Sequence, residues 1–251
     1  MSGHSKWNTI KRKKAKVDAQ RGKIFTKIIK EIVVAAREGG GDVESNTRLR
    51  TAIQNARDSN MPMANIEKAI KRGTGELPGV SYESCTFEGY APGGVAILVE
   101  SLTDNRNRIS AEIRHIFSKY GGHLGEPHSV SWMFEQKGII VIDSKHADEE
   151  QVLKIALENG ADDVRAEGEV FEVLCNPGSY EALRGKFIEN GIELQLSEVA
   201  LNPKNTVKLD KEHASTALKL VSMLEDNDDV QRVSANFDIP DDILGEIETD
   251  L

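Results

Sequence analysis

The chain has few of the residues that mark a secreted, membrane-spanning or aromatic-rich protein. Only 5% of its 251 residues are aromatic, and its two cysteines, Cys85 and Cys175, lie far apart with no C-x-x-C spacing. The longest apolar runs, "VAILV" at 95–99 and "IIVI" at 139–142, are far too short to cross a bilayer. The N-terminus carries charge but no apolar stretch of the kind a secretory signal needs. We therefore expect a cytoplasmic protein with reduced thiols and no membrane contact.

Motifs for catalysis or cofactor binding are also lacking. The sequence has no G-x-x-x-x-G-K-[ST] or G-x-S-x-G motif, and "GYAPGG" at 89–94 is typical of a hairpin turn. A metal-dependent hydrolase built on His115, His123 and His128 is the alternative, but their spacing matches no metal-binding frame. We expect no enzyme activity, no cofactor, no metal and no small-molecule substrate.

Charge is divided unevenly along the chain, whose formal net charge is -9. Residues 1–76 hold 17 Lys+Arg and 8 Asp+Glu, whereas residues 77–251 hold 15 and 33. This asymmetry predicts a basic module that meets a polyanion, joined to an acidic body. We interpret acidic runs such as "EDNDD" at 225–229 as solvated surface that repels phosphate.

The basic charge is densest close to the N-terminus. The candidate nucleic-acid contacts there are Lys6, Trp7, Asn8, Lys11, Arg12, Lys13, Lys14, Lys16, Arg21, Lys23 and Lys27. Such a segment has no apolar face with which to join a core, and phosphate contacts that release counterions would neutralise it. An indole can stack on an unpaired base and an amide can bond a base edge. The alternative is a solvated charge run with the indole packed against neighbouring helices.

A second candidate contact lies in "TDNRNR" at 103–108, where we expect Thr103 or Asp104 to cap a helix. Arg106 and Arg108 would then sit in the first turn, where the helix dipole disfavours positive charge. Glu100, Glu112 or a bound phosphate could offset this cost. A cap with surface ion pairs and a second nucleic-acid contact surface remain equal alternatives here.

Hydrophobic periodicity predicts three short helices followed by mixed strands and helices. Apolar stripes at helical spacing run through 22–42, 45–60 and 61–76, with Ile24, Ile28 and Ile32 among the inward positions of the first. After residue 80 the expected order is ββα–ββα–ββα–β–α–β, with a hairpin turning at "QKG" (136–138) and a frayed tail over the last dozen residues.

This order favours an α+β protein rather than a doubly wound fold. We expect a small N-terminal three-helix domain followed by two ferredoxin-like α/β sheet domains, one inserted in the other. The boundaries are 1–79 for the basic helical domain, 80–136 plus 200–251 for a discontinuous α+β domain, and 137–199 for the inserted βαββαβ domain.

Four stretches together resemble one family: "GHSKWNTIKRKKAKVDAQRGKIFTK", "GGGDVESNTRLRTAIQNARDSNMPMANIEKAIKRGTGE", "FEGYAPGGVAILVESLTDNRNR" and "SVSWMFEQKG". The chain is similar to members of the bacterial YebC family, whose mitochondrial relatives are translational activators of cytochrome c oxidase. The resemblance implies three domains, one inserted in another, and no enzymatic activity. It also implies a basic motif over Lys6 to Lys27 and an "LTDNRNR" motif over Leu102 to Arg108. One departure is His128, where the family usually has glycine, which weakens the case for a tight glycine turn.

The resemblance leaves two functions open. One is a DNA-binding transcriptional regulator, and the other is a ribosome-associated translation factor that binds rRNA or tRNA and relieves stalling at proline-rich stretches. The first predicts groove readout by a helix, and no helix in this sequence resembles one that reads bases. The second predicts a basic arm on structured RNA. The partner is therefore expected to be DNA or ribosomal RNA, and the residues alone do not separate the two.

Overall fold

The computed structural model describes residues 18–145 and 147–250, and it begins with a bundle of three helices. These are α2 (Asp18–Gly39), α3 (Thr47–Asp58) and α4 (Met63–Gly73). Leu49, Ile53 and Ala56 are buried on α3. Of the inward positions expected on α2, Ile32 is buried, but Ile24 is 45% exposed. The buried Asn46 side chain caps α3 by accepting from the Leu49 N–H at 3.0 Å, and it also donates to the Ala35 carbonyl of α2.

The first sheet has the strand order β3-β1-β2-β9, with antiparallel neighbours. Its strands are β1 (Glu83–Ala91), β2 (Val95–Thr103), β3 (His123–Leu124) and β9 (Val230–Ala235). α5 (Arg106–Lys119) and α8 (Lys211–Glu225) pack on one face of this sheet around a shared apolar core. β8 (Val207–Lys208) and β10 (Phe237–Asp238) form a small parallel pair beside it, followed by α9 (Asp241–Asp250).

The second sheet has the strand order β5-β6-β4-β7, again with antiparallel neighbours. Its elements are β4 (Phe134–Asp143), α6 (Glu149–Glu158), β5 (Ala161–Glu167), β6 (Val170–Cys175), α7 (Tyr180–Glu189) and β7 (Leu194–Pro203). This is the ferredoxin-like βαββαβ arrangement, with α6 and α7 on one face. In the first sheet, α5 connects β2 to β3, and β1 lies between these two strands. This is a split βαβ arrangement, which is related to the ferredoxin-like one.

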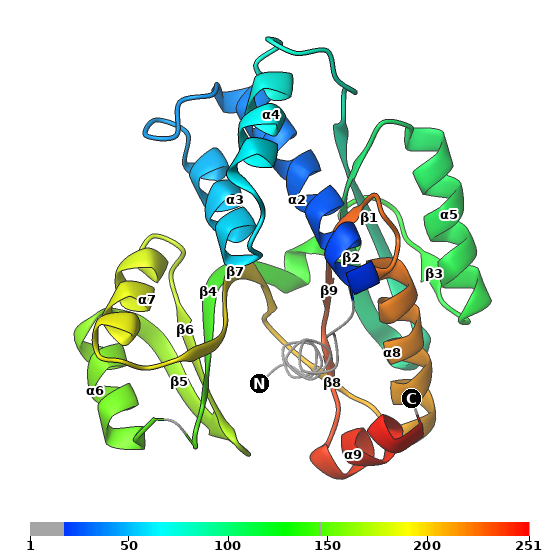
Figure 1. Ribbon diagram of the computed structural model, residues 1–251. Helices are drawn as coiled ribbons and strands as arrows, with labels where there is room; N and C mark the ends of the chain where they lie inside the picture. The colour runs from blue at the N-terminus through cyan, green and yellow to red at the C-terminus, as the bar shows by residue number, and fades with distance from the viewer. Residues whose placement is uncertain (1–17, 146, 251) are drawn as a thin grey trace.

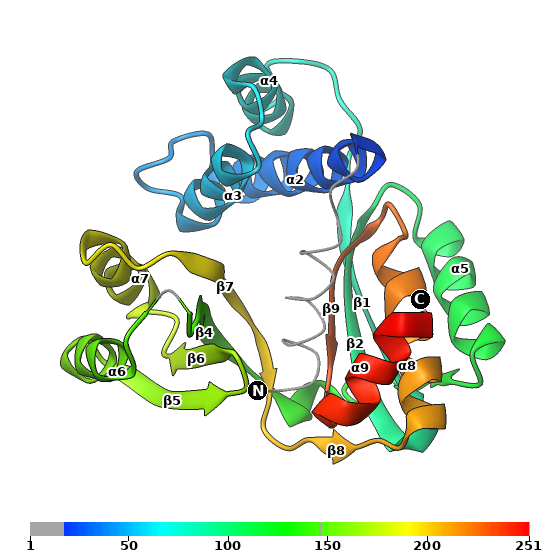
Figure 2. The same cartoon turned by 60° about the horizontal axis from the view of Figure 1, so that its bottom comes forward.

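The three parts are arranged around a common centre (Figures 1 and 2). The helix bundle lies across one end of the two sheets. α5 and α8 lie on the outer side of the first sheet, and α6 and α7 on the outer side of the second, so the helix-free faces of both sheets turn inward (Figure 2). The α+β class, with N-terminal helices followed by antiparallel sheets, is confirmed. The exact domain boundaries remain a prediction, with which the separate apolar clusters of the three parts are consistent.

Two local expectations were wrong. There is no hairpin at 136–138, because β4 runs unbroken through Gly138 and pairs with β7 along its length. Gly138 instead makes room for its neighbours, since a Cβ there would lie 2.6 Å from Cys175 Sγ. The last dozen residues are also not a frayed tail: they contain α9, which buries Leu244 and Ile247 against the core of the first sheet. None of the described helices is long and apolar enough to cross a membrane.

Candidate nucleic-acid interface

The structure describes only part of the expected basic contact set. Eight of its members, Lys6, Trp7, Asn8, Lys11, Arg12, Lys13, Lys14 and Lys16, lie outside the described residues. Arg21, Lys23 and Lys27 fall on α2, and Arg106 and Arg108 on the first turn of α5. The described members therefore belong to two different helices, and the contacts of three of them can be followed.

The lysines of α2 meet the end of α8. Lys23 donates to the Asp226 carbonyl at 3.2 Å, and Lys27 donates to the Glu225 carbonyl at 2.6 Å. The last carbonyls of a helix lack partners within the helix and carry the negative end of its dipole. The two ammonium groups therefore stabilise the C-terminus of α8, and they join the bundle to the first sheet.

One helical turn further along α2, Lys30 forms a buried ion pair with Asp229. Its ammonium lies 2.6 Å from Asp229 Oδ1 and also donates to the Asp228 carbonyl, and both side chains of the pair are only 8% exposed. The ammonium lies over the ring of Tyr82, 5.5 Å from its centre. The acidic run at 225–229 was expected to be solvated surface. In the structure its carbonyls and carboxylates bind three lysines of α2.

Asp229 also receives Arg108 from α5. Its Oδ2 lies 2.6 Å from Arg108 Nη2 and 2.8 Å from Thr103 Oγ1. Burial raises the pKa of Asp229, but the hydrogen bonds from Lys30, Arg108 and Thr103 outweigh burial and hold it below the ordinary value of 3.8. One carboxylate thus joins α2, α5 and the end of β2.

The N-cap residue predicted for α5 was wrong. Neither Thr103 nor Asp104 caps the helix; Asn105 does, with its side chain accepting from the Arg108 N–H at 3.0 Å. Arg108 also pairs with Asp104 at 2.7 Å and with Glu112 at 4.0 Å. Glu112 was one of the groups expected to offset the charge of the first turn, but Asp229, which is 121 residues away, was not foreseen.

A second organised feature, which the sequence reasoning missed, is the loop before β4. The buried carboxylate of Glu88 accepts from the backbone N–H groups of His128, Val130 and Ser131 at 2.7–2.8 Å. Burial raises the pKa of Glu88, but these N–H groups outweigh burial and hold it below the ordinary value of 4.5. His128 adopts a φ of +68°, in the left-handed region that favours glycine. The turn therefore does need a glycine-like conformation, contrary to the inference drawn from the departure at His128.

Comparison with known proteins identifies the family of the chain. A model described as the TACO1/YebC protein N-terminal domain matches residues 5–76, and one described as the TACO1/YebC second and third domain matches residues 82–237. The chain belongs to the TACO1/YebC family. It is 55% identical to a probable transcriptional regulatory protein of Pelotomaculum thermopropionicum, over 96% of this chain and all of that one. It is 56% identical to a protein of the same name from Syntrophus aciditrophicus, over 97% of this chain and 98% of the other.

A solved structure supports the same assignment. A conserved hypothetical protein from Aquifex aeolicus is 48% identical and matches with a TM-score of 0.81. The match covers 92% of this chain and 95% of the other, so it includes both sheets and the helix bundle. The α+β architecture is thus shared by a solved protein of similar sequence.

Other chemical groups of this TACO1/YebC protein offer little reactivity. Both cysteines are buried free thiols, and burial raises the pKa of Cys175 to about 11 and also raises that of Cys85. Within 18–145 and 147–250, no three His, Cys, Asp or Glu side chains are grouped so as to hold a metal ion.

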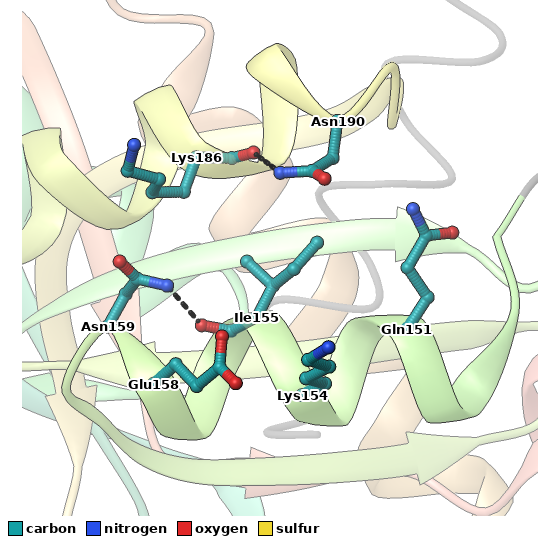
Figure 3. Close-up of a pocket in the computed structure, with 7 residues that line it drawn as sticks. All are labelled: Gln151, Lys154, Ile155, Glu158, Asn159, Lys186 and Asn190. Atoms are coloured by element: carbon teal, nitrogen blue, oxygen red, sulfur yellow. Dashed lines mark hydrogen bonds between the residues drawn. The ribbon is translucent and has the colours of Figure 1, made fainter.

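A hollow between α6 and α7 is open to solvent (Figure 3). Ile155, Lys154 and Lys186 are among the side chains that line it. Two of its amides are already used, because Asn159 donates to the Ile155 carbonyl and Asn190 to the Lys186 carbonyl, each at 2.8 Å. These bonds cap the ends of the two helices, so we assign the hollow no ligand.

Proposed function

We propose that this protein is a non-enzymatic, cytoplasmic regulator of gene expression that binds nucleic acid through its basic N-terminal segment. The observation that carries the proposal is the division of charge, with an excess of nine basic groups in residues 1–76 and an excess of eighteen acidic groups in the remainder. A basic module binds a polyanion, while an acidic body limits where else the protein can adhere. The relatives, which are named probable transcriptional regulatory proteins, support this class of function.

The contacts of the described lysines and arginines show which of them are already bound within the protein and which remain exposed to a nucleic acid. Lys27, Lys30 and Arg108 bind carbonyls and carboxylates of the protein itself, so their first role is to hold α2 and α5 on the acidic run. Arg106 is exposed and forms no ion pair with any described residue, which leaves it available to phosphate. On the helix bundle, Lys68, Lys71 and Arg72 of α4 are exposed as well. We place the main contact on the segment from Lys6 to Lys16, with α4 and Arg106 as additional cationic surface.

A ribosome-associated translation factor is the second candidate function. The observation that favours it is an exposed indole, Trp132, which has the chemistry to stack on an unpaired base. Folded RNA offers unpaired bases in loops and bulges, whereas duplex DNA keeps its bases stacked. Both candidates share the basic segment and differ in the nucleic acid that it meets.

Ultraviolet crosslinking in living cells, followed by sequencing of the attached nucleic acid, separates the two. Crosslinks concentrated on ribosomal RNA would support the translation factor, and crosslinks concentrated on particular DNA sites would support the transcriptional regulator. Recovery of neither would contradict the proposal and would direct attention to a protein partner of the acidic body. A variant with Lys11, Arg12, Lys13 and Lys14 changed to Ala is the matched control, and we expect it to lose most of the recovered crosslinks.

A further inference from the structure

Trp132 is the most exposed large aromatic side chain among the described residues, at 62% exposure. Its neighbours in the chain point the other way. Val130 and Phe134 are buried and pack with Ala96 and Leu98 on the helix-free face of the first sheet. The loop is therefore anchored on both sides of the indole, while the indole itself is directed to solvent. Exposing an indole forgoes the stabilisation that burial of so large a side chain gives.

Hydrogen bonds hold this exposed residue in place. The indole N–H of Trp132 donates to the Ser129 carbonyl at 3.1 Å. The Trp132 carbonyl accepts from Lys204 Nζ at 3.0 Å, and the Lys204 N–H bonds the Met133 carbonyl at 2.9 Å. The bond to Ser129 favours one orientation of the indole and satisfies its polar N–H, so the exposed part of the ring is apolar.

The loop beneath the indole is built to be rigid. The Ser129 carbonyl that accepts from Trp132 also accepts from the Tyr90 hydroxyl at 3.1 Å, and the Tyr90 ring stacks on His123. Three N–H groups of 128–131 bind the Glu88 carboxylate, and His128 is held at a positive φ. Strained backbone persists only where the surroundings over-determine it, and such residues cluster at functional sites.

We propose that Trp132 is a preorganised platform on which an unpaired base of a folded RNA stacks, with Lys204 as the adjacent cation. A rigid indole loses little conformational entropy on binding, and stacking tolerates any base because every base has a π-face. Duplex DNA would have to unstack a base to use such a platform, whereas an RNA loop presents one already. The inference rests on the proposed nucleic-acid binding and assigns it a second site, far in sequence from the basic segment.

The surroundings of the platform predict how it contributes. The exposed charged or titratable groups on the loop and the strands beside it are His123, Glu126, His128, Glu135 and Lys204. With two carboxylates among them, the site has no strong positive potential. Trp132 should therefore add affinity by stacking, with little effect on the dependence of binding on salt.

The chain offers a direct test because it has only two tryptophans, Trp7 and Trp132. In a Trp7→Phe background Trp132 is the only indole, and its fluorescence reports contact with a base. The probes are a dye-labelled RNA hairpin with a single-stranded loop, a blunt DNA duplex of equal length, and a single-stranded DNA, with binding followed independently by anisotropy. We expect the hairpin to quench Trp132, and the duplex to bind without quenching it.

Affinity variants complete the test. We expect Trp132→Ala to weaken hairpin binding by about tenfold with an unchanged salt dependence, and Trp132→Phe to retain most of the affinity. Leu157→Ala, at a 73% exposed side chain on α6, is the matched control and should bind like the parent protein.

The outcomes are distinguishable. Hairpin binding without quenching, and with equal affinity for Trp132→Ala, would overturn the platform but leave the proposed function standing. Absence of binding to any probe by the parent protein, measured by anisotropy, would overturn both. Equal quenching by single-stranded DNA would overturn the preference for RNA.

Discussion

Lys30 and Asp229, separated by 199 positions in the sequence, meet through a buried ion pair of 2.6 Å that joins the helix bundle to the first sheet. The pair does not act alone, since Asp229 also receives Arg108 and Thr103. A carboxylate with three donors has enough hydrogen bonds to compensate for its removal from water. Asp229 is therefore the buried part of the contact between the helix bundle and the first sheet, to which Lys23 and Lys27 also contribute at the end of α8.

Asp229→Ala should destabilise the protein strongly. The change leaves the buried ammonium of Lys30 without its carboxylate, and breaking a buried pair in this way costs about 3–5 kcal/mol. Chemical denaturation followed by circular dichroism would measure the loss. Lys23→Ala is the control: its ion pair with Asp226 is 3.7 Å long and about half exposed, so it should cost less than about 1 kcal/mol. Equal losses in the two variants would mean that the buried pair contributes no more to the free energy of unfolding than an exposed pair does.

The same carboxylate should make stability depend on pH in acid. Because the pKa of Asp229 is lower in the folded protein than in the unfolded chain, its contribution is fully present above the unfolded value of about 4. That contribution is lost as the pH falls through the lowered pKa. We expect the difference in unfolding free energy between wild type and Asp229→Asn to be constant from pH 7 to about 5, and to shrink below pH 4. A difference that stays constant down to pH 2 would contradict this assignment.

His128→Gly should stabilise the loop before β4. At a φ of +68° an L-residue is strained by about 1–2 kcal/mol, and glycine removes the strain while losing part of the gain to its flexible unfolded state. We expect a net gain of about 0.5–1 kcal/mol in thermal or chemical unfolding. Asn60, with a φ of +57°, is the matched control, because asparagine tolerates this region and Asn60→Gly should be nearly neutral. A loss of stability in His128→Gly would show that the imidazole makes a contribution larger than the strain.

Gly138→Ala should destabilise the second sheet. The new Cβ would lie 2.6 Å from Cys175 Sγ and 2.9 Å from atoms of Tyr180, both of them buried. Overpacking of this kind costs about 1–3 kcal/mol. Gly185→Ala in α7 is the control: a Cβ there would meet no side chain or neighbouring element within 4 Å, and alanine favours helix, so we expect a gain of about 0.5–1 kcal/mol. A neutral Gly138→Ala would mean that β4 and α7 can separate without cost.

Local patterns predicted most of the architecture, because they are short-range. The stripe of Leu49, Ile53 and Ala56 gives α3 its buried face, and the βαββαβ order from β4 to β7 gives the ferredoxin-like sheet. Gly138 misled the prediction because glycine marks both turns and close packing, and only the position of Cys175 across the sheet distinguishes them.

The contacts around Asp229 and Glu88 could not be predicted from the sequence, because they join residues that are far apart in the chain. Nothing near Lys30 in sequence signals that its partner is Asp229, and the acidic run around Asp229 has the composition of solvated surface. The one usable signal was Arg108 in a first helical turn, which required an offsetting charge. No nearby residue indicated the role of the Glu88 carboxylate either, since its three N–H partners lie 40–43 positions away in the sequence.

The basic segment yields the prediction that tests the proposed function most directly. Replacing Lys11, Arg12, Lys13 and Lys14 by Ala should weaken nucleic-acid binding and flatten the plot of log K against log salt. The slope should fall by about one unit for each phosphate that the variant no longer neutralises, because each neutralised phosphate releases condensed counterions. Titrations at several salt concentrations would measure it.

Two control variants separate the arm from the rest of the basic charge. Lys27→Ala should lower stability with little change in slope, because its ammonium binds the Glu225 carbonyl rather than solvent. Lys68→Ala combined with Lys71→Ala removes exposed charge from α4, and a smaller change in slope than that of the four-residue variant would place the main contact on the arm. An unchanged slope in the four-residue variant would remove the arm from the interface, and a larger change in the α4 variant would assign the phosphate contacts to the helix bundle.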